Sequence, residues 1–228
     1  MLGVVLMNMG GPDSLEAVEP FLRNLFSDHD LIKFPLGGFG QGTVARIIAS
    51  RRATKVRELY KSIGGRSPIA DLTERQARGL EAALRGAGVD CRCYVAMRYW
   101  KPFADEAVRA LKADGVDRVL GLTLYPQFSY ATTGSSLKDL GRALGQGQVT
   151  APLTSIDRYG DDDAYLDALA ETVRVGLDGV PAAARDRVPV LFSAHGLPQS
   201  YVDKGDPYER EVRATVAGCP ATSPSAKW

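Results

Sequence analysis

The chain has 228 residues, of which 45% are hydrophobic, and a formal net charge of +1. This length and apolar content suit one large globular domain or two small ones. The near-zero charge and the lack of a long basic run argue against a surface that attracts a phosphate backbone, so nucleic acid is not an expected partner.

The N-terminus and the cysteines indicate the compartment. Residues 1–12 lack the cationic lead-in and small-residue cleavage site of a secretory signal, and we expect the first strand there instead. No apolar run approaches the roughly 20 residues that a membrane helix needs. Three cysteines are too few for a disulfide framework and suit a reducing compartment. We therefore expect a soluble, cytoplasmic protein.

Short apolar runs alternate with segments of helical periodicity along the chain. Five runs rich in β-branched residues predict strands at residues 4–9, 91–97, 119–125, 149–156 and 188–194. Helices are predicted at residues 20–26, 73–88, 101–115 and 162–179. The alternation predicts an α/β fold with Rossmann-like, doubly wound parallel sheets flanked by helices. We expect a first domain over residues 1–160 and the start of a second over residues 161–228.

Ligands of such sheets bind beyond the carboxyl ends of the strands. The segments that follow four of the predicted strands are residues 10–12, 98–100, 126–136 and 195–198. We expect them to converge on one edge of the sheet. The last of them begins with His195, one of only two histidines in the chain.

The helix starts and glycines have simple structural interpretations. Thr73 and Gln76 have capping-box spacing at the start of a helix, and Ser135 and Ser136 also precede a helix, where hydroxyls cap free N–H groups or hold an anion. The glycines at residues 10 and 11 lack the spacing of a phosphate-binding loop. Pro12, which follows them, has no backbone N–H to donate to a phosphate. A tight turn that lets the backbone approach a flat ligand is the better interpretation.

Several polar residues have the chemistry of catalytic or metal sites but not the full set of partners that such sites need. Cys91 and Cys93 share a strand face but lack the further ligands of a zinc site. His29 lies in a polar stretch and is expected at the surface. Ser193 and His195 lack the nucleophile elbow of a hydrolase. His195 can instead accept protons or bind a borderline metal ion, the alternative being a satisfied core histidine.

Residues 46–61 carry six cations and one acid. Arg52, Val56 and Tyr60 share one helical face at spacings of four residues. A solvated basic face is one interpretation, and a surface for a hydrophobic ligand that bears carboxylates is the other. Ser67 follows in the same neighbourhood.

Five motifs together resemble the ferrochelatase family, which inserts ferrous iron into porphyrins. They are VVLMNMGGPDS, IGGRSPI, YPQFSYATTGSS, SIDRYG and LFSAHGLPQSYVDKGDPY, and they occur in this order between Val4 and about Thr215. The resemblance implies two Rossmann-like domains around a porphyrin cleft, with protoporphyrin IX and Fe²⁺ as substrates, protohaem as product and two protons released. It implies no nucleotide cofactor, and no ligands for a [2Fe-2S] cluster are evident.

The resemblance also implies roles for individual residues. His195 matches the family's active-site histidine, proposed both as iron ligand and as acceptor of pyrrole protons. Met9 matches a position against the macrocycle where methionine is typical of enzymes that act on protoporphyrin IX and tyrosine of those that act on coproporphyrin III. Positions in or near the porphyrin pocket match Arg52, Tyr60, Ser67, Arg98 and Ser136.

Residues 31–39 resemble the apolar lip around the cleft of that family. Their large apolar side chains are expected to meet the substrate or a membrane surface, which makes peripheral membrane contact a hypothesis; they are Leu31, Ile32, Phe34, Leu36 and Phe39.

The chain departs from the family pattern after Thr215. The family's second half, with its Asp-His-x-Glu motif, has no counterpart, and we expect a C-terminally truncated chain that is inactive or poorly soluble by itself. Three functions stay open: iron insertion into protoporphyrin IX, iron insertion into coproporphyrin III, and noncatalytic binding of porphyrin or haem. A flavodoxin-like nucleotide module is a more distant alternative.

Overall fold

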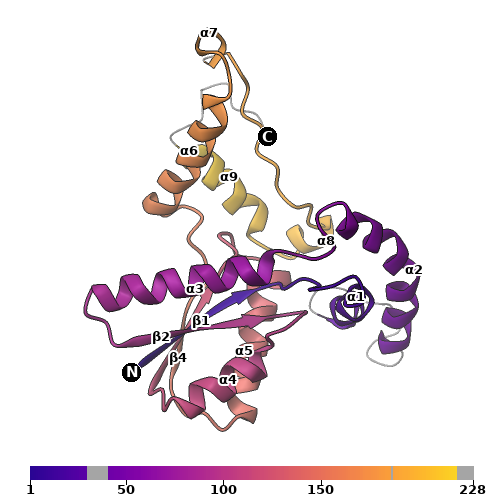
Figure 1. Cartoon of the computed structure of the whole chain (residues 1–228), viewed down its shortest axis with the longest axis vertical. Helices are drawn as coiled ribbons and strands as arrows, with labels where there is room; N and C mark the ends of the chain where they lie inside the picture. Colours follow the sequence, from indigo (N-terminus) through magenta and orange to yellow (C-terminus); the bar gives the residue numbers. More distant parts are fainter. Residues whose placement is uncertain (30–40, 186, 220–228) are drawn as a thin grey trace. The chain divides into compact units, whose positions relative to one another are not determined.

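The computed structural model describes residues 1–29, 41–185 and 187–219 (Figure 1). The chain divides into two compact units. Unit 1 comprises residues 1–125 and 130–157, and unit 2 comprises residues 126–129 and 158–228. The division after Asp157 lies next to the boundary expected at residue 160, and the short segment 126–129 joins the second unit.

Unit 1 contains a four-stranded parallel sheet in the order β2-β1-β3-β4. The strands are β1 (Leu2–Asn8), β2 (Cys91–Met97), β3 (Arg118–Thr123) and β4 (Leu153–Ile156). All three strand pairings are parallel, and each connection between strands that follow one another in the chain contains at least one helix, as parallel pairing requires. The predicted α/β fold with a parallel sheet is confirmed, although β4 begins later than residue 149.

Helices cover both faces of the sheet. On one face, α3 (Ile69–Gly86) packs over the apolar side chains of β1 and β2 through Ala77. On the other face, α4 (Ala104–Ala113) and α5 (Ser135–Gln146) enclose a second core with β1 and β2. Because β1 has apolar neighbours on both sides, its interior reads as a continuous hydrophobic run and not as an alternating one.

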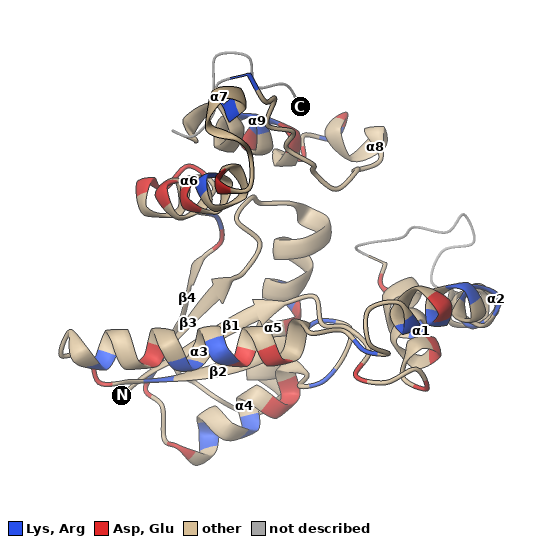
Figure 2. Ribbon diagram, turned by 45° about the horizontal axis from the view of Figure 1, so that its top comes forward, with Lys and Arg blue, Asp and Glu red and all other residues tan. Residues whose placement is uncertain are grey.

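A pair of helices lies beside the sheet and its covering helices. It consists of α1 (Val18–Ser27) and α2 (Gln41–Lys61), which meet through a row of fully buried alanines on α2: Ala45, Ala49 and Ala53. Small side chains at intervals of four allow the two backbones to approach closely. The opposite side of α2 is exposed and basic, as Figure 2 shows by the blue bands along this helix.

Two predicted helix starts are wrong. α1 begins at Val18, because Pro20 lies in the first turn, where the backbone N–H has no intrahelical acceptor and proline is tolerated. α3 begins at Ile69, so Thr73 is a buried interior residue and not a cap. Its hydroxyl accepts a hydrogen bond from Asn8 Nδ2 at 3.1 Å.

Unit 2 is helical in its described part. Its helices are α6 (Asp163–Asp178), α7 (Ala182–Arg185), α8 (Gln199–Val202) and α9 (Tyr208–Gly218). Asp162 caps α6 by accepting hydrogen bonds from the amides of Ala164 and Tyr165 at 3.0 and 3.2 Å.

The predicted strand at residues 188–194 is wrong. Only Leu191 carries a β-bridge, and the rest of the run is extended without ladder pairing. An apolar run becomes a strand only when a neighbouring strand satisfies its backbone N–H and C=O groups, and no strand is assigned among the described residues of unit 2.

Residues 126–129 join unit 2 through side chains on α9 and just before it. Gln127 donates to the hydroxyl of Thr215 at 2.9 Å, and the amide of Phe128 donates to Glu211 at 2.7 Å. Within the described ranges, no helix is long and apolar enough to cross a membrane.

Candidate functional site

The chain segments after β1 and β2 lie side by side. The amides of Arg98 and Tyr99 donate to the carbonyls of Asn8 and Met9, both at 2.9 Å. These bonds continue the parallel pairing of β1 and β2 past the ends of both strands. The expected convergence of these two segments on one edge of the sheet is therefore observed.

The glycine turn after β1 is shaped by close protein neighbours. Gly10 has a φ of +80°, and a Cβ there would lie 3.0 Å from the backbone nitrogen of Trp100. A Cβ on Gly11 would lie 2.6 Å from both Cβ and Oγ of Ser67, whose amide donates to the carbonyl of Pro12 at 2.8 Å. The close approach that requires glycine thus comes from Trp100 and Ser67 of this chain.

Three of the predicted porphyrin-site residues surround the α1–α2 core. Met9 and Tyr60 pack against it as half-buried side chains. The Arg52 guanidinium carbon lies 5.5 Å from the centroid of the Phe26 ring, and the arginine is exposed to solvent. Burial raises the pKa of the Tyr60 phenol.

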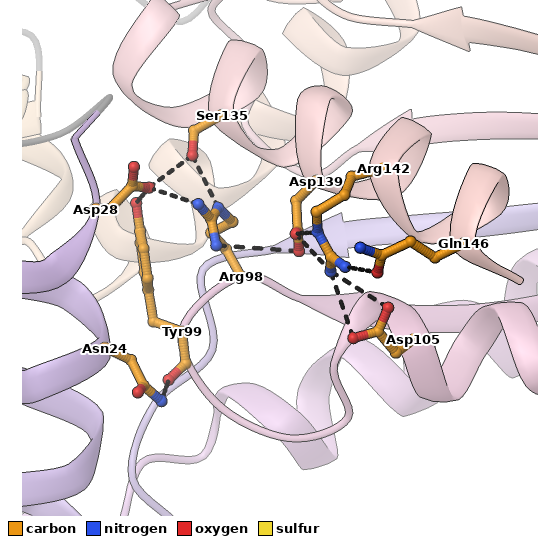
Figure 3. A network of polar contacts seen from close by, with 9 residues as sticks. All are labelled: Asn24, Asp28, Arg98, Tyr99, Asp105, Ser135, Asp139, Arg142 and Gln146. Carbon is orange, nitrogen blue, oxygen red and sulfur yellow. Dashed lines mark hydrogen bonds and ion pairs between the residues drawn. The ribbon is translucent and has the colours of Figure 1, made fainter. Parts of the chain in front are cut away.

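Arg98, at the end of β2, is the centre of a buried polar network (Figure 3). Its Nη2 lies 2.9 Å from Oδ2 of Asp28, and its Nε donates to the Ser135 hydroxyl at 2.8 Å. The hydroxyls of Ser135 and Tyr99 both donate to the same Asp28 oxygen at 2.7 Å. The network therefore joins the end of α1, the end of β2 and the start of α5.

The network extends along α5 through a second arginine. Arg98 Nη1 lies 3.9 Å from Asp139, which accepts a hydrogen bond from Arg142 Nε at 2.9 Å. Arg142 also contacts both carboxylate oxygens of Asp105, at 3.2 and 3.3 Å, and hydrogen-bonds to Gln146. Figure 3 shows the chain of contacts running from Asp28 to Asp105.

Sequence reasoning missed Asp28 and Tyr99 as members of this site. The side chain of Asp28 is 3% exposed, although it stands in the polar stretch FSDHDL. Burial, together with the Asp28 charge and hydrogen bond, raises the pKa of Tyr99 far above its ordinary range. No local spacing signals such a contact, because its members are up to 107 residues apart.

The two serines at the start of α5 do not act as caps. A π-helical turn, η1 (Tyr130–Gly134), runs directly into α5, and the cap position at Gly134 has no side-chain hydrogen bond. Ser135 belongs to the Arg98 network instead. Ser136 is buried beside the phenol of Tyr125, whose pKa is raised by burial.

His195 lies in unit 2, on a pocket of about 470 Å³. The imidazole is exposed, so the alternative of a satisfied core histidine is not observed. The pocket has an apolar wall and five polar side chains: Ser193, His195, Gln199, Tyr208 and Glu209. An exposed imidazole on such a wall can accept a proton from a hydrophobic ligand or offer a nitrogen to a metal ion.

The remaining predicted residues are not part of these sites. His29 is exposed, as expected. Cys91, Cys93 and Cys219 are free thiols. No group of three His, Cys, Asp or Glu side chains that could hold a metal ion is found in the part of the chain that the structure describes. The expected lip at residues 31–39 falls outside the described residues.

Comparison with known proteins identifies relatives for nearly the whole chain. The family model described as ferrochelatase matches residues 1–226. Proteins named ferrochelatase from Geobacter metallireducens and Geotalea daltonii are 50% and 51% identical over 213 residues. A ferrochelatase from a Synechococcus strain is 44% identical over 219 residues.

The coverage of these relatives is unequal. Each alignment includes 93% of this chain. It includes 65% of the Geobacter and Geotalea proteins and 55% of the Synechococcus protein. The chain therefore spans about two thirds or less of the length of these relatives.

Proposed function

The chain belongs to the ferrochelatase family, and from this premise we propose that it inserts ferrous iron into protoporphyrin IX, with release of two protons. The observation that carries the proposal is the exposed imidazole of His195 on an apolar pocket. An apolar wall suits a porphyrin face, and an imidazole suits the proton and metal chemistry of its centre.

Metal insertion needs a base. A free porphyrin carries two N–H protons in the plane of the ring, and both must leave as the two nitrogens bind Fe²⁺. A neutral imidazole has one unprotonated nitrogen, which can accept a pyrrole proton or bind iron but not both at once. We assign His195 the role of proton acceptor and of transient iron contact in separate steps, with bulk water taking up the released protons.

The macrocycle is proposed to contact residues of unit 1. Met9 supplies an apolar contact to the ring, because its flexible thioether adapts to a flat surface. Arg52 is an exposed cation that suits a propionate. Tyr60, Ser67 and Ser136 of the same unit are also proposed to contact the porphyrin. Arg98 belongs to the same edge of the sheet.

The choice between porphyrins is proposed to depend on Met9. Protoporphyrin IX carries two carboxylates and coproporphyrin III carries four, so the first offers the more apolar periphery. A methionine suits the apolar periphery, whereas a tyrosine adds a hydrogen-bonding phenol. We expect Met9→Tyr to shift the ratio of the two insertion rates toward coproporphyrin III, measured by absorbance of the two haem products.

Further parts of the proposal concern cofactors and location. We propose that the reaction needs no cofactor besides its substrate Fe²⁺ and takes place in the cytoplasm. Apolar side chains at Leu31, Ile32, Phe34, Leu36 and Phe39 are proposed to touch a membrane surface. Phe34→Asp should then lower co-sedimentation with liposomes, and unchanged co-sedimentation would refute the contact.

An absorbance titration tests the function. Protoporphyrin IX is added to the purified 228-residue chain, first alone and then with Fe²⁺ under anaerobic conditions. We expect saturable porphyrin binding in the first titration. The second titration decides between the proposed insertion, which gives the spectrum of the iron porphyrin at a rate above that of the protein-free mixture, and the inactive chain that the sequence led us to expect.

Two other results would be informative. Saturable binding without accelerated metal insertion would identify a noncatalytic porphyrin binder and refute the catalytic proposal for this chain. No saturable binding would refute both functions. His29→Ala is the matched control for any histidine variant, since His29 is exposed and lies outside the network and the pocket.

A further inference from the structure

Arg98 is held by other side chains of this protein. Its Nη2 and Nε have close partners in Asp28 and Ser135, at 2.9 and 2.8 Å. Its third nitrogen faces Asp139 at 3.9 Å, and its guanidinium carbon lies 5.2 Å from the Tyr99 ring centroid. All three nitrogens of the guanidinium group therefore face protein groups, and the side chain is 23% exposed.

The charges around Arg98 also disfavour an anionic ligand. A cavity of about 300 Å³ beside it is lined by three carboxylates, Asp28, Asp105 and Asp139, and by two guanidinium groups, Arg98 and Arg142. The acids outnumber the cations. A carboxylate brought to this place would meet like charges and would have to displace a hydrogen-bonded partner of Arg98.

The network is linked to the expected macrocycle contact through the backbone. The amide of Tyr99 donates to the carbonyl of Met9, and the carbonyl of Tyr99 accepts from Asn24 Nδ2 at 3.1 Å. The phenol of Tyr99 is in turn held by Asp28 at 2.7 Å. Fixing Asp28 thus fixes the backbone that positions Met9.

We propose that Asp28 is a positioning residue of the porphyrin site, acting through Arg98 and Tyr99. Arg98 supports porphyrin binding by holding the ends of β1 and β2 in place, and it does not pair with a porphyrin carboxylate. This inference rests on the proposed porphyrin binding. It adds a role for a residue that contacts neither iron nor macrocycle.

The experiment compares two ligands that share one macrocycle and differ in whether their two propionate groups carry charge. Protoporphyrin IX and its dimethyl ester share one macrocycle, but the ester lacks the two carboxylates. Binding of both is measured by absorbance or fluorescence titration, in detergent, for the wild-type chain, Arg98→Met, Asp28→Asn and the double variant. Loss of an ion pair with a propionate lowers the affinity for the free acid only. Displacement of the binding-site residues lowers the affinity for both ligands.

We expect Arg98→Met and Asp28→Asn each to lower the binding affinity for both porphyrins about tenfold. A small misplacement of a contact residue is enough for such a loss. The double variant should lose no more porphyrin affinity than either single variant, since the two residues act as one unit. The absorbance band of the bound porphyrin should also shift, which a mere loss of folded protein does not cause.

Two further variants serve as controls. Arg52→Met removes an exposed cation and is expected to lower the binding affinity for the free acid but not for the dimethyl ester. Ser135→Ala removes one neutral member of the network, so the experiment stays decisive if a charge variant fails to fold. For Ser135→Ala we expect a smaller loss of binding affinity than for the charge variants. The loss should be equal for both ligands, and the absorbance band should shift in the same way.

The outcomes separate this inference from the proposed function. A loss in Arg98→Met or Ser135→Ala that is confined to the acid would overturn the positioning role while leaving porphyrin binding intact. Unchanged binding of both ligands in Ser135→Ala and Asp28→Asn would overturn it as well. Failure of the wild-type chain to bind either porphyrin would overturn the proposed function and this inference together.

Discussion

At the scale of single residues, the candidate functional residues are of two kinds. His195 is exposed on its pocket and its position at the end of an apolar run was readable from the sequence. Asp28 is buried, and its partners come from distant parts of the chain. A local pattern can indicate the first kind, whereas the second exists only once α1, β2 and α5 have packed together.

The first prediction at this scale concerns catalysis. His195→Ala should lower the rate of iron insertion about 10²-fold or more, the usual contribution of a positioned acid–base group. Porphyrin affinity should change less than about threefold, because the macrocycle is held mainly by apolar contacts. Initial rates and titrations on the same preparation measure both quantities. An unaltered insertion rate would exclude His195 as the base.

The second prediction at this scale concerns Cys93. Burial, followed by the nearby Cys91 and Glu81 groups, raises the pKa of this thiol to about 12. The folded chain therefore keeps Cys93 protonated at pH 9, where the unfolded chain ionises it. Iodoacetamide at pH 9 should label Cys93 slowly in the native chain and rapidly in urea, as followed by mass spectrometry.

The same shift predicts how stability depends on pH. Because the folded-state pKa lies above the unfolded one, the contribution of Cys93 is fully present below about pH 8.5 and declines as the pH rises toward 12. The urea midpoint of Cys93→Ser should therefore fall less than that of the wild-type chain between pH 8 and 10. Equal falls would contradict the assigned shift.

At the scale of elements, contacts between segments decide details that local periodicity does not. Pro20 predicted a later start for α1, yet the helix begins at Val18 because the first turn tolerates proline. Ser135 has the residue type of a cap, but a π-helical turn precedes it and its hydroxyl joins Arg98 and Asp28. The existence of most elements was thus predictable, while their exact ends and side-chain partners were not.

A prediction at this scale concerns the turn after β1. Gly11→Ala places a Cβ 2.6 Å from the Ser67 side chain and should destabilise the chain by about 1–3 kcal/mol through overpacking. Adding Ser67→Gly removes the colliding atoms and should restore part of the loss. Urea denaturation measures all three chains.

Gly79 supplies the matched control for this turn. It lies inside α3, and a Cβ there would meet no atom within 4 Å. Gly79→Ala should leave stability unchanged or raise it by up to about 1 kcal/mol, because alanine is the better helix former. A similar loss in both glycine variants would show that the turn is not sterically restricted.

At the scale of the whole molecule, the two units differ in how their backbone N–H and C=O groups are hydrogen-bonded. Unit 1 has a four-stranded sheet with helices on both faces. In unit 2 the run around Leu191 is extended, and Leu191 itself is 79% exposed. An exposed backbone without ladder hydrogen bonds opens at little energetic expense.

Limited proteolysis tests this difference. Chymotrypsin should cut after Leu191 or Phe192 before it cuts within α3, α4 or α5, because the protease needs an extended, accessible segment. Mass spectrometry of the fragments over time identifies the order of cleavage. Cleavage inside the helices of unit 1 while the bonds after Leu191 and Phe192 stay intact would contradict the structure.

The sequence by itself determined the α/β class, the strands of the parallel sheet in unit 1 and the family, because alternating periodicities and five ordered motifs are local properties. It also indicated His195, which follows directly on an apolar run. Only the tertiary structure decided that Asp28 is buried against Arg98, that Ser67 faces Gly11, and that residues 188–194 form no ladder. Each of these depends on which distant segment supplies the neighbouring atoms, and no local spacing encodes that.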